Sequence, residues 1–153
     1  MLIYLILAVV LIAADQLIKA WVVAHIALGA TQPFIPGILS LTHIHNNGAA
    51  FSILEGKQWF FYIITVVALV VVAALWRDSK GAPWYRLGLT LIFAGAIGNF
   101  IDRVRLKYVV DMFQFDFMNF AISNFADWCL TVGVVIVVIY LLFFDKGDSK
   151  RKR

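Results

Sequence analysis

Long apolar runs, separated by shorter polar segments, dominate this sequence. Four of the runs are long enough, or nearly so, to cross a bilayer, because about 20 helical residues span the hydrocarbon core. They are Ile3–Val23, Gln58–Trp76, Trp84–Ile101 and Trp128–Phe144. The pattern predicts four transmembrane helices. An even number of helices places both ends of the chain on the same side of the membrane.

Two of the segments between these helices have a different pattern. Residues 24–57 hold turn residues and short alternating runs such as ILSLTHI, which predict a small β element. Residues 104–126 alternate as well, and there Asp111 has the same parity as Phe113 and Phe115. The predicted fold class is an all-α integral membrane protein, a single domain over residues 1–153. Its β element and short connector lie on the extracytoplasmic side.

The composition agrees with insertion into a bilayer. Apolar residues make up 63% of the 153 residues and the mean hydropathy is +0.90, whereas a soluble domain is about half apolar. Asp15 and Lys19 interrupt the first apolar run and no basic segment precedes it. We therefore expect this run to stay in the protein as a helix and not to be removed as a signal peptide.

Lys and Arg residues are distributed unevenly along the chain. Residues 77–86 and the tail at 145–153 hold eight of the thirteen, against three in the two opposite connectors. This asymmetry predicts that both termini, including the basic tail, lie in the cytoplasm. Basic tails beside membrane helices set topology or contact anionic lipids. The net charge of +4 is therefore not taken as a sign of nucleic-acid binding.

Polar residues collect where the predicted helices approach the outer membrane surface. Ionisable residues in membrane spans usually serve a function, because burying them is unfavourable unless they are paired. Asp15 and Lys19 are four positions apart on the first helix, so they lie on one face. Further polar residues end the third helix, lie in the last connector or open the fourth helix: Asn99, Asp102, Arg103, Asp111 and Asp127.

Each of these residues also has a purely structural interpretation. Asp15 and Lys19 can form a neutralising pair, and Asp102 and Arg103 a helix-end ion pair. Asn124 and Asp127 fit the N-cap and N3 positions of the fourth helix, and Asp111 can be a solvated loop carboxylate. His43 and His45 have no third ligand in view, so no metal site is predicted, and Cys129 is interpreted as a core residue.

Two aspartates near a membrane surface suit a particular hydrolytic chemistry. If Asp111 and Asp127 lie close together, both cannot ionise at neutral pH, and they share a proton. One carboxylate then acts as a base on water while the protonated carboxyl acts on the scissile amide. No serine stands in a G-x-S-x-G context and Cys129 has no histidine near it in sequence. The carboxylate pair is the best-supported hydrolytic mechanism.

Five short motifs, spread over nearly the whole chain, resemble those of bacterial lipoprotein signal peptidase (signal peptidase II), a membrane aspartic endopeptidase. In chain order they are DQLIK (Asp15–Lys19), NNGAAF (Asn46–Phe51), GAIGNFIDR (Gly95–Arg103), VVDMF (Val109–Phe113) and NFADW (Asn124–Trp128). Two departures are modest: Trp128 follows the last aspartate, where a small residue is common, and the spacing between the two aspartates is slightly short.

The resemblance implies a catalytic pair, Asp111 and Asp127, with no cofactor and no metal. It implies a substrate, a prolipoprotein whose lipobox cysteine carries diacylglyceryl and which is cut on the amino side of that cysteine. It also implies residence in the bacterial cytoplasmic membrane. The supporting or substrate-binding positions that it implies are Asp15, Lys19, Asn46, Gly48, Gly95, Asn99, Asp102, Arg103 and Asn124.

We assign expected roles to some of these positions. Arg103 organises the peptide backbone or the carboxylates, and Asp102 restrains Arg103. Asn46 and Asn124 hold peptide or lipid carbonyls. Gly95 and Gly98 allow a substrate helix or a neighbouring helix to approach closely.

Two other functions stay open at this point. An ion- or proton-coupled transporter would place its charges near the middle of the bilayer, on broken helices. A non-enzymatic assembly factor would use the polar residues to hold helices together. We expect a monomer in contact with membrane lipids.

Overall fold

The computed structural model describes residues 1–48, 54 and 56–144, so the basic tail and the last three residues of NNGAAF lie outside it. Its helices are α1 (Leu2–His25), α2 (Gln58–Asp78), α3 (Pro83–Leu106) and α4 (Phe125–Phe143). All four are long and apolar enough to cross a membrane. The predicted four-helix membrane fold is confirmed.

Two helix boundaries differ by three residues or more from the predicted ones, for local reasons. Helix α3 continues past Ile101 and ends where Lys107 adopts a left-handed conformation, with φ of 71°. Helix α4 begins before Trp128, because Asn124 and Asp127 form a complete capping box. Both changes extend helix toward the end of the bundle where the polar residues collect.

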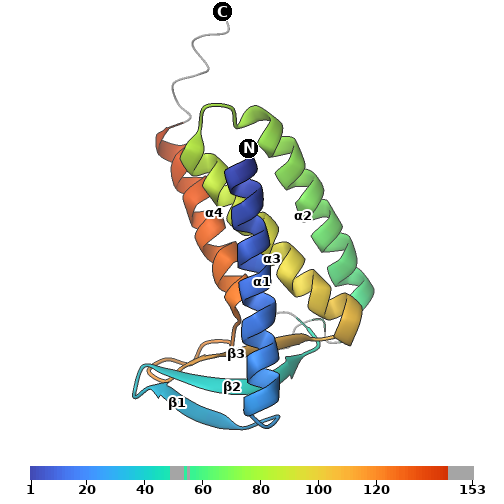
Figure 1. Ribbon diagram of the computed structural model, residues 1–153, viewed down its shortest axis with the longest axis vertical. Coiled ribbons are helices and arrows are strands. Elements are labelled where there is room, and N and C mark those ends of the chain that lie inside the picture. Colours follow the sequence, from blue (N-terminus) through green and yellow to red (C-terminus); the bar gives the residue numbers. More distant parts are fainter. Residues whose placement is uncertain (49–53, 55, 145–153) are drawn as a thin grey trace, which may run out of the picture.

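The β element is a three-stranded antiparallel sheet in the order β1 (Thr31–Ile35), β2 (Leu39–Asn46) and β3 (Val109–Phe115). The first connector supplies β1 and β2, and the second connector supplies β3. The sheet lies across one end of the helix bundle (Figure 1). The start of α1, the α2–α3 loop and the end of α4 lie at the other end. Strand β3 pairs Asp111 with Ile44 of β2.

Helix α3 is the centre of the bundle and packs against α1, α2 and α4. Glycines allow the closest of these approaches: a Cβ on Gly88 would lie 2.9 Å from the Gly133 carbonyl oxygen of α4, and one on Gly95 would clash with the Ala126 carbonyl oxygen. The predicted close approach to a neighbouring helix at Gly95 is therefore made by α4.

A buried apolar cluster joins α1 to the sheet. It contains Val22, Ile26, Leu41, Val110 and Met112. Val110 and Met112 of β3, on either side of Asp111 in sequence, belong to this cluster, and side chains alternate along a strand. Asp111 is therefore directed to the opposite face of β3, toward α3 and α4.

Candidate active site

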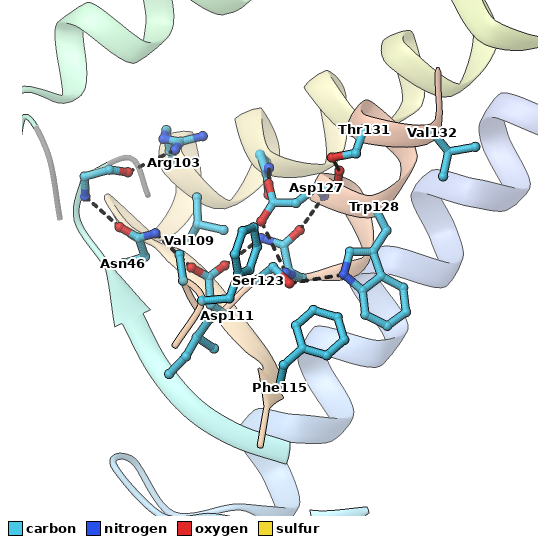
Figure 2. Close-up of a pocket in the computed structure, with 16 residues that line it drawn as sticks. Asn46, Arg103, Val109, Asp111, Phe115, Ser123, Asp127, Trp128, Thr131 and Val132 are labelled. Atoms are coloured by element: carbon cyan, nitrogen blue, oxygen red, sulfur yellow. Dashed lines mark hydrogen bonds between the residues drawn. The ribbon is translucent and has the colours of Figure 1, made fainter. Parts of the chain in front are cut away.

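A cavity of about 780 Å³ opens at the sheet end of the bundle, among β3, α3 and α4. Asp111 comes from the strand and Asp127 from the first turn of α4, and both line this cavity (Figure 2). Asn46, Gly48, Asn99, Arg103 and Asn124 line it as well. The chain therefore brings seven of the predicted site residues, from four separate segments, around one space.

Asn124 links the two aspartates. Its Nδ2 donates to Asp111 Oδ1 over 2.6 Å, while its Oδ1 accepts from the Asp127 backbone N–H over 2.9 Å. Its own backbone N–H donates to Asp127 Oδ2 over 3.2 Å. The side chain is fully buried, and the cap fixes which way the amide faces. Asn124 is thus both the predicted N-cap of α4 and a hydrogen-bond donor to Asp111.

Two further asparagines hold the remaining carboxylate oxygens. Asn46 Nδ2 donates to Asp111 Oδ2 over 2.8 Å, and Asn99 Nδ2 donates to Asp127 Oδ1 over 2.7 Å. Each amide oxygen is occupied elsewhere: Asn46 Oδ1 accepts from the Gly48 N–H, and Asn99 Oδ1 accepts from Lys19 Nζ. Every oxygen of the two carboxylates therefore has one neutral donor.

Burial sets the protonation of Asp111, which is 1% exposed. Desolvation first, and the nearby charge of Asp127 second, raise its pKa from the ordinary 3.8 to about 6, against the opposing effect of the hydrogen bonds from Asn124 and Asn46. A neutral carboxyl group at Asp111 is thus accessible near neutral pH. This is the property that an acid in such a pair needs.

The raised pKa predicts a pH-dependent stability. Because the folded protein holds the Asp111 proton up to about pH 6 and the unfolded chain releases it near 3.8, the free energy of unfolding falls as pH rises through this window. The loss is about 3 kcal/mol by pH 7. The Asp111→Asn variant lacks this contribution. Thermal unfolding midpoints in detergent, measured from about pH 4 to 8 for both proteins, test this. Parallel pH curves would contradict it.

Arg103 provides the cation of the cavity. Its Nη2 donates to the Gly48 carbonyl oxygen over 3.3 Å, and its guanidinium lies 4.5 Å from the ring centroid of Phe61. Among the described residues its buried Nε has no hydrogen-bond partner. The guanidinium therefore has donors left for another group in the cavity.

The expected restraint of Arg103 by Asp102 is wrong. Within the described residues Asp102 pairs instead with Lys19, with Nζ 3.0 Å from Oδ2. Neighbouring helical residues point about 100° apart, so Asp102 is directed to α1 while Arg103 faces the cavity. Lys19 also pairs with Asp15 over 2.9 Å, as the spacing predicted. Asp15, Lys19, Gly95 and Asp102 are not among the residues that line the cavity.

Two contributing residues, Gln16 and Trp128, were not predicted as site residues. The two N–H groups of Gln16 Nε2 are shared among Asp15 Oδ2, Asp102 Oδ1 and the Gly98 carbonyl oxygen, which lie 3.1, 2.9 and 3.2 Å away. The signal available was its position: a polar side chain inside the apolar run, next to Asp15. Trp128 stacks on Phe113 and donates from Nε1 to Ser123 Oγ over 3.1 Å. It thereby fixes the segment before α4.

His43 and His45 have structural contacts. His43 Nδ1 lies 2.8 Å from the Ile26 carbonyl oxygen, and the His45 ring stacks on Tyr108. Across the described part of the chain, no three His, Cys, Asp or Glu residues are grouped as metal ligands. Neither histidine lines the cavity.

Fold and site together define a class: multi-pass membrane proteins with a pair of carboxylates in a cavity at one end of the helix bundle. Within this class, residues 7–143 match the family described as Signal peptidase (SPase) II. The lipoprotein signal peptidase of Lactiplantibacillus plantarum is 60% identical over 147 residues, covering 96% of this chain and 99% of that protein. That of Enterococcus faecalis is 52% identical, with coverage of 98% and 94%.

Solved structures agree with these relatives. One described as a bacterial membrane enzyme has a TM-score of 0.88 and 36% identity, covering 98% of this chain and 91% of that one. Another has a TM-score of 0.85 and 37% identity, with coverage of 92% and 93%. The chain belongs to the signal peptidase II family and is a multi-pass bacterial membrane peptidase. This confirms the resemblance of the motifs and favours a peptidase over a transporter or an assembly factor.

Proposed function

We propose that this peptidase is an aspartic endopeptidase that removes the signal peptide from diacylglyceryl-modified prolipoproteins. One observation carries the mechanism: two carboxylates from different elements, Asp111 buried and Asp127 half-buried, line one cavity and share Asn124 as a hydrogen-bonding partner. In that setting one proton shared between the two is favoured over two charges.

The reaction follows from such a singly protonated pair. The ionised carboxylate takes a proton from water, whose oxygen attacks the carbonyl carbon of the residue before the lipidated cysteine. The protonated carboxyl donates to the carbonyl oxygen, which gives a tetrahedral diol. The C–N bond then breaks as the cysteine nitrogen takes the proton that the first carboxylate removed from water, and the second carboxylate recovers its proton from the diol. The products are a signal peptide with a new carboxylate and a lipoprotein with a free amine on its cysteine.

Arg103 and the asparagines are proposed to hold the substrate backbone and the carboxylates. The Arg103 Nε donor, which has no partner among the residues that the structure describes, suits a peptide or ester carbonyl oxygen. The opposite wall of the cavity is apolar and includes Phe115, Phe120, Trp128 and Val132, of which Phe120 and Val132 are about half exposed. Such a wall suits acyl chains that stay partly in the bilayer.

The proposed orientation puts the cavity and the sheet at the outer surface of the cytoplasmic membrane and both termini in the cytoplasm. It is supported by the excess of Lys and Arg in residues 77–86 and 145–153. It would bring the scissile bond to water while the signal peptide remains in the membrane. We also expect a monomer to be active, because this chain alone brings seven of the predicted site residues around the cavity.

Cleavage of a diacylglyceryl-modified prolipoprotein by the purified protein in detergent tests the proposed function. We expect mass spectrometry to find a single cut before the lipidated cysteine. The same precursor without diacylglyceryl is the control, and it should be cut at least about 10²-fold more slowly, because it lacks the apolar groups that position the scissile bond. Failure to cut the modified precursor, or equal cutting of both precursors, would refute the proposal.

A further inference from the structure

Lys19 is the centre of a buried network behind the cavity. Its ammonium has three N–H groups, and each has a partner: Asp15 Oδ2 at 2.9 Å, Asp102 Oδ2 at 3.0 Å and Asn99 Oδ1 at 3.1 Å. Lys19, Asp15 and Asp102 are all buried. The network therefore joins α1 to α3 without contact with solvent.

The two carboxylates of the network have a second set of partners. Asp15 Oδ1 accepts the backbone N–H of Ala126 over 2.9 Å, and Asp102 Oδ2 accepts the backbone N–H of Val110 over 3.2 Å. Ala126 directly precedes Asp127, and Val110 directly precedes Asp111. Each network carboxylate thus holds the peptide group next to one member of the proposed catalytic pair.

Charge neutralisation alone does not account for this arrangement. One lysine needs one carboxylate, and a second buried carboxylate leaves an excess negative charge that is unfavourable without further donors. The additional donors here are Gln16 Nε2 and the two backbone N–H groups. The presence of both carboxylates is explained if Asp15 holds the backbone at Ala126 and Asp102 holds the backbone at Val110.

We propose that Asp15 and Asp102, joined by Lys19, are positioning residues that set the separation of the Asp111 and Asp127 carboxylates. Lys19 also fixes the amide of Asn99, so that Nδ2 faces Asp127. These three residues do not line the cavity, so they act on the catalytic groups and not on the substrate. This inference rests on the proposed function.

Two substitutions of Asp15 distinguish its role as a hydrogen-bond acceptor from the effect of its negative charge. Asp15→Asn keeps an oxygen for the Ala126 N–H but removes the charge, whereas Asp15→Leu removes both. Because small displacements of catalytic groups reduce turnover by about 10²-fold, we expect Asp15→Leu to lose about that much in kcat with KM little changed. Asp15→Asn should retain at least about tenfold more kcat than Asp15→Leu.

A second pair of variants tests the position of Asp15 without replacing it: Gly98→Ala displaces Asp15, and Gly88→Ala is the control. A Cβ on Gly98 would lie 2.7 Å from Asp15 Oδ2, whereas a Cβ on Gly88 of the same helix would meet Val137 at 2.8 Å and the Gly133 carbonyl oxygen at 2.9 Å. Both Gly→Ala changes crowd α3 against a neighbouring helix. We expect both to lower the thermal unfolding midpoint, and only Gly98→Ala to lower kcat by about tenfold or more.

The outcomes distinguish this inference from the proposed function. Wild-type cleavage, with loss in Asp15→Leu and Gly98→Ala, partial retention in Asp15→Asn and normal kcat in Gly88→Ala, supports the positioning role. If Asp15→Asn and Asp15→Leu lose kcat equally, or if Gly98→Ala matches Gly88→Ala in kcat, the positioning role is overturned while cleavage stands. A wild-type protein that does not cut the modified prolipoprotein overturns the proposed function itself.

Discussion

Replacing either Asp111 or Asp127 by Asn is expected to lower kcat for prolipoprotein cleavage by at least about 10³-fold, within the range that general acid–base groups supply. An amide can neither take the proton from water nor donate one as an acid. The two effects will not add, because the carboxylates act as a unit. Initial rates on a diacylglyceryl-modified prolipoprotein in detergent, with thermal unfolding midpoints for each variant, measure this.

Asp116→Asn is the matched control for these two substitutions. Asp116 follows β3, is exposed, and accepts a hydrogen bond from Ser40 Oγ over 3.0 Å. It lies outside the cavity lining, so its loss should leave kcat within about twofold, as surface changes usually do. A folded Asp111→Asn or Asp127→Asn protein with near-normal turnover would remove that residue from the catalytic pair. Loss of folding in both would favour a role in holding helices together.

The helices could be predicted from the sequence because membrane insertion imposes a length and a hydropathy that single segments carry. The position of β3 in the sheet was harder to predict. The alternation around Asp111 was visible, but its pairing with Ile44 joins residues far apart in the chain. Pairing of that kind depends on how α3 returns the chain to the sheet, which no local pattern encodes.

The site could be predicted as a set of residues but not as a set of contacts. The i, i+4 spacing correctly paired Asp15 with Lys19, and the capping pattern correctly placed Asn124 and Asp127. Adjacency in sequence suggested Arg103 as the partner of Asp102, whereas Lys19 of another helix is the partner found. Which face of α3 meets α1 is decided by interhelical packing through Gly98 and its neighbours, and this is a property of the assembled bundle.

Asn124 gives the second large expected effect, because one side chain caps α4 and contacts Asp111. Asn124→Ser keeps an oxygen for the cap, since Ser and Asn are similar N-cap residues, but it is too short to donate to Asp111. Asn124→Ala loses both interactions. We expect kcat to fall by about 10²-fold in each variant, because the Asp111 carboxyl loses the donor that orients it.

Stability separates the two roles of Asn124. Loss of the cap in Asn124→Ala removes about 1 kcal/mol from the free energy of unfolding, whereas Asn124→Ser should retain most of it. Thermal unfolding midpoints and kcat, measured on the same preparations, therefore give two independent readings. If Asn124→Ser cleaves at the wild-type rate, Asn124 is a helix cap alone. If its kcat falls while its midpoint stays near wild type, the 2.6 Å hydrogen bond to Asp111 supports catalysis in its own right.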